Sequence, residues 1–183
     1  MNNEIDKMIE NMFINNPLMK FSVYTQIQFS TLKRIRELIL VELDSLFYED
    51  KNSLKIDVQK FNEIYGLFWL WILGAYEIVR TMCQRKSCFK EEVYDKLDIY
   101  KRKISAIRMP FAKQEIARTN KPISNEASIS GIHQETKDLS FTIGDNIFYM
   151  RETMCDFIEI ISSISIDDIN RDLRDWVKEP SGR

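Results

Sequence analysis

The residues of this chain that most readily bind zinc or act as a catalytic base or thiol nucleophile are one histidine, His133, and three cysteines, Cys83, Cys88 and Cys155. These four residues are the smallest set that could form a Cys₃His zinc site. Structural zinc pairs usually lie on a tight knuckle with two to four residues between them, whereas here Cys83 ends a long apolar segment and four residues separate it from Cys88. We therefore expect no metal and no cofactor, and we expect thiols that are buried or incidental.

Nucleophilic catalysis by serine or cysteine needs a base within reach, and His133 is the only imidazole. The segment 133–138, HQETKD, is typical of a hairpin turn, where a histidine is usually solvated. Phosphate-binding loops are absent from the sequence, because it contains no Gly-x-Gly and no Gly-Lys-Ser/Thr. Helical ribonucleases of the HEPN class carry Arg, then four to six residues, then His, but the corresponding positions 126–128 here are Glu, Ala and Ser. We expect a non-catalytic protein.

The segment 101–121 is strongly basic, with seven lysines and arginines against one acidic residue. A nucleic-acid-binding or RNA-processing protein is therefore the alternative to a protein-binding one. Lys101 and Lys103 lie on opposite sides of the apolar stripe of their helix, a distribution that favours a solvated face over a continuous binding track. The candidate nucleic-acid contacts are Lys101, Arg102, Lys103, Lys113, Arg118 and Lys121.

A polar cluster is predicted where two apolar helices meet. Glu77 continues the face of Leu70 and Leu73, and Arg108 lies at the edge of its own apolar stripe, so we expect the two to form an ion pair, or Glu77 to pair with Lys113 instead. Such a cluster either fixes helix register or lines a pocket for a small anion. Its members are Tyr76, Glu77, Arg80, Arg108, Lys113 and Glu115.

The segment 57–85 carries several of these candidate residues, including Tyr76, Glu77, Arg80 and Cys83. It holds no charge from Ile64 to Tyr76 and is apolar on all sides, which predicts a central buried helix beginning after Asp57. Gly66 and Gly74 would let a neighbouring helix approach closely. The uncharged run is about 20 Å long, too short to cross a bilayer, and we expect no membrane contact.

The other elements follow from periodicity. Apolar residues recur at helical spacing on both sides of Pro110, so one helix is predicted to continue through that proline with a kink. Residues 49–54 read as a polar loop, residues 127–143 as a β-hairpin and residues 179–183 as a frayed tail. We predict one all-α domain over 1–183, an α-helical bundle of five or six helices with this small β-hairpin insert. The predicted helices are 3–14, 21–48, 57–85, 88–118, 146–163 and 166–177.

Composition gives the class of protein. The chain has 183 residues, 44% of them hydrophobic and 30% charged, with a formal net charge of −2. These values are ordinary for one soluble domain and show no overall bias toward nucleic acid. The N-terminus lacks a signal-peptide pattern, so we expect a cytoplasmic protein. The amphipathic helices 3–14 and 166–177 must bury their apolar faces, so we predict a homo-oligomer or a protein partner.

Overall fold

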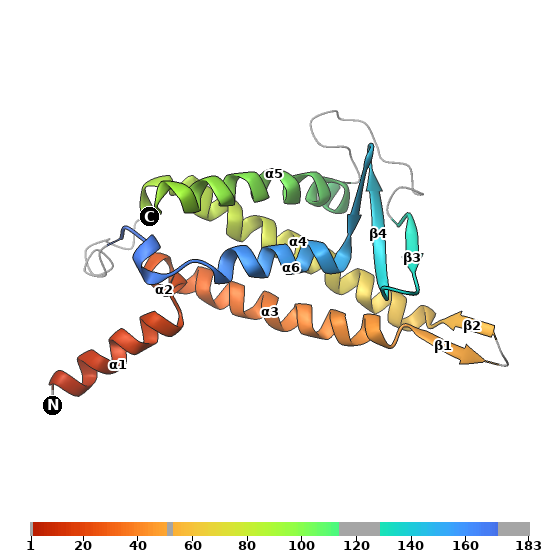
Figure 1. Ribbon diagram of the computed structural model, residues 1–183, viewed down its shortest axis with the longest axis horizontal. Helices are drawn as coiled ribbons and strands as arrows, with labels where there is room; N and C mark the ends of the chain where they lie inside the picture. Colours follow the sequence, from red (N-terminus) through yellow and green to blue (C-terminus); the bar gives the residue numbers. More distant parts are fainter. Residues whose placement is uncertain (1, 51–52, 114–128, 172–183) are drawn as a thin grey trace.

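The computed structural model describes residues 2–50, 53–113 and 129–171. Within these ranges the fold is mostly helical, but it also contains two small antiparallel sheets (Figure 1). The all-α prediction is therefore only partly right. The α-helices are α1 (Asn2–Asn15), α2 (Leu18–Phe21), α3 (Val23–Asp44), α4 (Val58–Gln84), α5 (Glu91–Lys113) and α6 (Met150–Ser162).

Helix α4 is the predicted central helix. Asp57 caps it, because the Asp57 carboxylate accepts hydrogen bonds from the backbone N–H groups of Gln59 and Lys60. Its main contacts are with α3 on one side and α5 on the other. Trp71 is fully buried, donates its indole N–H to the Leu32 carbonyl of α3 at 3.1 Å and packs edge-on against Phe157 of α6. Neighbouring helices on two sides thus cover most of the apolar surface of α4, whereas Trp69 and Leu70 stay 41% and 51% exposed.

The glycines of α4 differ in their surroundings. A Cβ at Gly74 would lie 3.0 Å from Leu32 Cδ2, so the prediction of close helix approach is right there. A Cβ at Gly66 would have no neighbour within 4 Å, so the same prediction is wrong for Gly66.

Helix α5 continues through Pro110, as predicted, and Pro110 is buried. Its apolar stripe faces the core, and Tyr100 donates its hydroxyl to the Thr153 carbonyl of α6 at 2.8 Å. Residues 114–118, which were predicted to end this helix, lie outside the described residues.

The long helix predicted for 21–48 is divided at Ser22. This residue is extended, with φ −163°, and its hydroxyl accepts a hydrogen bond from the Thr25 N–H, so Ser22 ends α2 and caps α3. The predicted polar loop 49–54 is also wrong. The chain forms a hairpin there, with β1 (Phe47–Asp50) paired antiparallel to β2 (Ser53–Ile56).

The predicted 127–143 hairpin belongs to a three-stranded antiparallel sheet of order β3-β4-β5, built from β3 (Gly131–His133), β4 (Asp138–Ile143) and β5 (Asn146–Tyr149). Residues 127 and 128 lie outside the described ranges. Strand β5 replaces the first turn of the helix predicted for 146–163. Ile143 pairs with Asn146 around Gly144 and Asp145, and Gly144 has φ +60°, which glycine adopts readily.

The last predicted helix, 166–177, does not begin as expected. Residues Ile166–Asp168 form a single 3₁₀ turn, and the predicted capping box between Ser165 and Asp168 is present. Ile169 then forms a β-bridge with Phe89 and is buried, which ties this segment to the start of α5. Residues 172–183, including the predicted tail, lie outside the described ranges.

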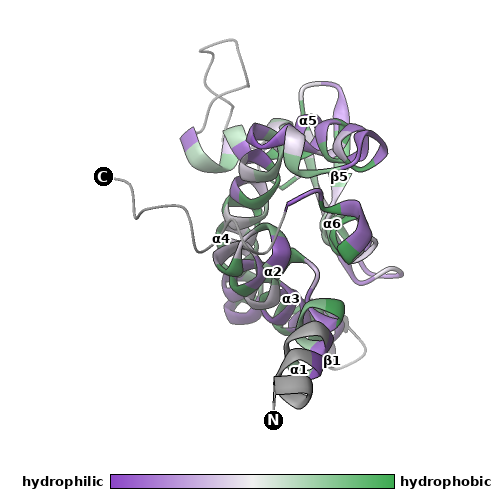
Figure 2. Ribbon diagram, turned by 90° about the vertical axis from the view of Figure 1, so that its left-hand side faces the viewer, coloured by the Kyte–Doolittle hydropathy of each residue, from purple (hydrophilic) through white to green (hydrophobic). Residues whose placement is uncertain are grey.

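Helices α3, α4, α5 and α6 supply most of the buried hydrophobic core, and each of them carries both hydrophobic and hydrophilic residues along its ribbon in Figure 2. Aromatic rings fill the core where the helices meet β4: Phe141 stacks on Phe68 with ring centres 5.3 Å apart. Among the described helices, none is long and apolar enough to cross a membrane.

Candidate functional site

The predicted polar cluster divides into two separate pairs. Glu77 forms an ion pair with Arg80 on its own helix at 2.6 Å, with both side chains almost half exposed. Arg108 of α5 instead places its guanidinium over the ring of Tyr76, 5.0 Å from the ring centre. No ion pair joins Glu77 to Arg108 within the described part of the chain, so that predicted contact is wrong.

The position of Arg108 explains this result. Its Nε is buried without a hydrogen-bond partner, and its Nη1 lies 3.3 Å from the sulfur of Met109. The partner of the Arg108 guanidinium is thus the aromatic face of Tyr76 and not the predicted carboxylate of Glu77. Lys113 is exposed at the end of α5, and Glu115 lies outside the described residues.

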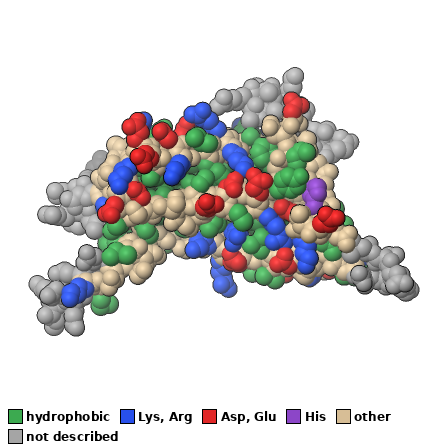
Figure 3. All heavy atoms as spheres, viewed as in Figure 1, with side chains coloured by type: hydrophobic (Ala, Val, Ile, Leu, Met, Phe, Trp, Pro, Cys, Tyr) green, Lys and Arg blue, Asp and Glu red, His purple; other side chains and the backbone are tan. Residues whose placement is uncertain are grey.

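Three of the candidate nucleic-acid contacts form ion pairs with carboxylates of this chain. Lys101 and Arg102 both pair with Asp98 on α5, and these two cations lower the pKa of Asp98 below its usual range. Lys103 reaches two carboxylates of α6 at 3.0 and 2.6 Å. Acidic groups therefore lie among these cations, and Figure 3 shows blue and red side chains interspersed over the visible face.

Of the other three candidate nucleic-acid contacts, only one lies within the described residues. Lys113 is exposed, whereas Arg118 and Lys121 lie outside the described residues. The structure therefore brings together only part of the predicted basic segment.

The thiols and the histidine do not converge. Cys83 is buried, and burial raises the pKa of its thiol. Cys155 is exposed on α6, with its sulfur 3.3 Å from Arg36 Nη2. Within the described residues, no group of three or more His, Cys, Asp and Glu side chains is arranged to hold a metal ion.

His133 lies in β3 and not in the turn that was predicted for it. Its Nε2 is 2.9 Å from the hydroxyl of Ser140 on β4, a distance suited to a base and a nucleophile. A Cβ at Gly131 would lie 2.7 Å from both of these atoms, so the contact requires glycine at that position. Ser140 is only 2% exposed, however, and a buried hydroxyl cannot attack a substrate at the surface.

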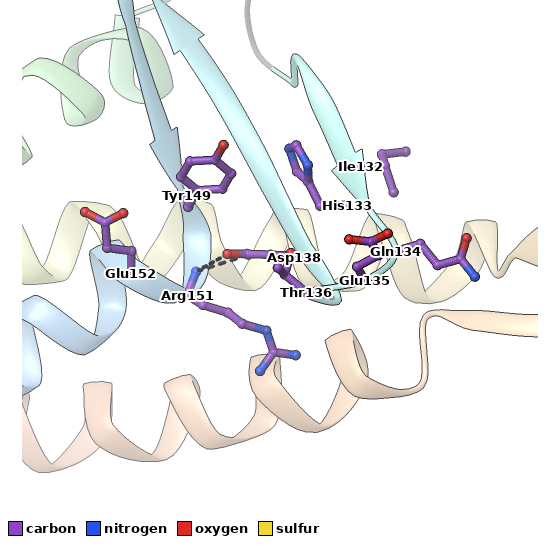
Figure 4. A pocket seen from close by; sticks show the side chains of 9 residues that line it. All are labelled: Ile132, His133, Gln134, Glu135, Thr136, Asp138, Tyr149, Arg151 and Glu152. Carbon is purple, nitrogen blue, oxygen red and sulfur yellow. Dashed lines mark hydrogen bonds between the residues drawn. The ribbon is translucent and has the colours of Figure 1, made fainter.

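An open pocket of about 750 Å³ lies beside this histidine, between the outer face of the sheet and the start of α6. In Figure 4, His133 and Tyr149 project on the same side of the sheet, while Arg151 extends the other way. The Arg151 guanidinium is held by Asp44 and by the Lys137 carbonyl. The guanidinium of Arg151 therefore links the start of α6 to the end of α3 and to the residue before β4.

A different surface is formed by α3. Its buried residues, including Phe29, Leu32 and Leu43, face the core. On the opposite side, residues recur at alternating steps of three and four, and four of them are apolar and exposed: Tyr24 by 77%, Ile27 by 58%, Leu38 by 49% and Val41 by 63%. We call this row the α3 stripe; its members are Tyr24, Ile27, Thr31, Arg34, Leu38 and Val41.

Sequence reasoning missed the α3 stripe because it looked for exposed apolar faces on the two terminal helices and not on the helix predicted for 21–48. The signal was nevertheless present, since the helix carries two apolar rows and a single core can cover only one of them. A groove of about 650 Å³ runs along the stripe, between α2 and α3. Its lining includes Met19, Val23, Ile27, Arg34, Ile35 and Leu38.

Helix α1 also exposes apolar side chains. Met8 is 72% exposed, Met12 40% and Ile14 54%, and no described side chain of α1 belongs to the buried core. In Figure 1 the helix leaves the rest of the molecule near α2 and points away from it. We call this helix the α1 arm.

Comparison with known proteins finds no relative: the sequence matches no protein-family model, no curated protein and no solved structure. The function is therefore inferred from the fold and from these surfaces.

Proposed function

We propose that this protein works through protein–protein contacts and that it associates with further copies of itself through the α3 stripe. The observation that supports this proposal is the row of four large apolar side chains, each about half or more exposed, along one line of a well-packed helix. Two apolar pairs, Tyr24 with Ile27 and Leu38 with Val41, lie on either side of Thr31 and Arg34 in this row. Apolar side chains grouped along one helix side are typical of an interaction surface, whereas single exposed apolar residues are common on any protein.

The spacing of the α3 stripe suits a helical partner. Steps of three and four residues keep a row of side chains aligned along one side of a helix, as in the contact seam of a coiled coil. Fully burying an exposed large apolar side chain gains about 1.5–3 kcal/mol. The four side chains are only 49–77% exposed, so it takes the stripes of two copies together to supply a gross gain on the order of the roughly 8 kcal/mol of micromolar binding. Part of that gain offsets the entropy lost on association.

Two charges placed in the α3 stripe test the proposal. The variant Ile27→Glu with Leu38→Glu should abolish self-association, because association would bury two unpaired carboxylates. Ile99→Glu is the matched control: Ile99 is equally apolar and 68% exposed, but it lies on α5. Light scattering after gel filtration should show weaker self-association only for the α3 variant. Equal effects of the two variants would argue against a specific surface.

The alternative function, nucleic-acid binding or RNA processing, has less support. It relies on the basic segment 101–121 and on the Glu77 and Arg108 cluster. Lys101, Arg102 and Lys103 lie among the carboxylates that pair with them, and these carboxylates would repel phosphate. Glu77 and Arg108 face different partners. A mobility-shift assay with a short RNA at low salt tests this alternative, since binding should weaken steeply as salt rises.

A further inference from the structure

We infer that the α1 arm of one copy seats in the groove beside α3 of a second copy, so that two chains exchange their arms. This inference rests on the proposed self-association and specifies which element covers the part of the α3 stripe that lines the groove, from Ile27 to Leu38. Its first support is that one chain presents both halves of the contact: Met8 and Met12 are exposed on the arm, and Ile27 and Leu38 are exposed on the groove.

The connection between α1 and α2 directs the arm away from its own groove. The backbone N–H and the side-chain amide of Asn16 both donate to the Met12 carbonyl, which fixes the end of α1. The Asn16 carbonyl accepts from the Met19 N–H, and the Pro17 carbonyl accepts from the Lys20 N–H, so α2 begins at once. Pro17 also has a restricted φ. Because hydrogen bonds hold both sides of this junction, folding the arm back onto its own α3 would break them.

The lengths of the two surfaces match. The arm has 14 residues, a helix of about 21 Å. The groove side chains on α3 run from Val23 to Leu38, about 22 Å along the helix axis. One arm can therefore cover the groove from end to end.

The sequence of α1 is acidic overall, with Glu4, Asp6 and Glu10 against a single lysine, Lys7. The groove is lined by Arg34, and no ion pair to Arg34 is found within the described part of the chain. An acidic amphipathic helix is thus the partner that this groove favours, and a second copy provides one.

Two full-length variants test the exchange. Met8→Glu with Met12→Glu removes the apolar face of the arm, and Ile27→Glu with Leu38→Glu blocks the groove. Since all four side chains lie outside the core, thermal unfolding followed by circular dichroism should be little changed. Each variant alone should associate at least ten times more weakly than the unmodified chain, measured by sedimentation equilibrium. An equimolar mixture should recover part of the affinity, because the intact arm of one chain can still enter the intact groove of the other.

The outcomes separate this inference from the proposed function. If the arm covers its own groove, the arm variant frees that groove and associates more tightly, which would overturn the exchange. If the arm takes no part, the arm variant associates normally while the groove variant does not, which also overturns the exchange but leaves self-association intact. An unmodified chain that does not associate would contradict the proposed function itself.

Discussion

The buried carboxylate of Asp138 on β4 accepts hydrogen bonds from the backbone N–H of Arg151, 13 residues further along the chain, in the first turn of α6. Tyr149, the residue before α6, provides no side-chain cap. The sheet therefore caps the helix, and Asp138 links the two parts of the C-terminal half of the molecule.

Asp138 should make stability depend on pH. Burial raises the pKa of Asp138 above the usual 3.8, although the N–H groups of Arg151 and Leu139 oppose the shift. The folded state thus binds this proton more tightly than the unfolded state. The stabilisation that comes from protonated Asp138 is fully present below about pH 3.8, the usual pKa, and is lost as the pH rises through the pKa of Asp138 in the folded state.

Comparison with Asp138→Asn isolates this effect, because Asn keeps an acceptor for the Arg151 N–H but does not titrate. Urea unfolding at a series of pH values should show the unmodified chain losing stability relative to Asp138→Asn as pH rises from about 3.8. A stability difference that stays constant over pH would show that Asp138 does not change protonation during folding.

The glycines of α4 give a prediction with an internal control. Gly66→Ala should stabilise the protein by about 0.5–1 kcal/mol, because alanine favours the helix and the new methyl group has no neighbour within 4 Å. Gly74→Ala should gain less or destabilise, because its Cβ would lie 3.0 Å from Leu32 Cδ2. Chemical denaturation midpoints measure both. A larger gain at Gly74 than at Gly66 would contradict the packing described.

The partners of Glu77 and Arg108 predict a pattern of coupling. Glu77→Ala and Arg108→Ala should have additive effects on the free energy of unfolding, since the two side chains contact different groups. Arg108→Ala and Tyr76→Leu should instead be coupled, by about 0.5–1 kcal/mol for a cation over an aromatic face. Double-mutant cycles provide the test. Strong coupling between Glu77 and Arg108 would instead indicate that these two residues form the ion pair predicted from the sequence.

The helices that sequence analysis placed well are those with a long apolar repeat and a polar cap. The signal for α4 is Asp57 before a long apolar run, and the signal for α5 is the apolar stripe on both sides of Pro110. Both signals are local in sequence, and the tertiary packing agrees with them. The strands were harder to place. Gly144 and Asp145 form a two-residue hairpin loop, but Ile147, Met154 and Ile158 also fit a helix, and the longer pattern was preferred.

The candidate sites depended on facts that a sequence does not contain. A helical wheel places Glu77 and Arg108 on particular faces, but it does not give the rotation of one helix against the other. Arg80, three residues from Glu77, was a closer partner from the start. The α3 stripe was visible as a second apolar row, yet only the packed structure shows which row the core covers.

Sedimentation equilibrium of the unmodified chain is the most direct test of self-association through α3. The apparent mass should rise from 21.8 kDa toward twice that value with increasing concentration, while the Ile27→Glu, Leu38→Glu variant should stay at 21.8 kDa. An unmodified chain that remains at 21.8 kDa up to about 100 µM, where association would be weaker than about 5.5 kcal/mol, would contradict the proposal.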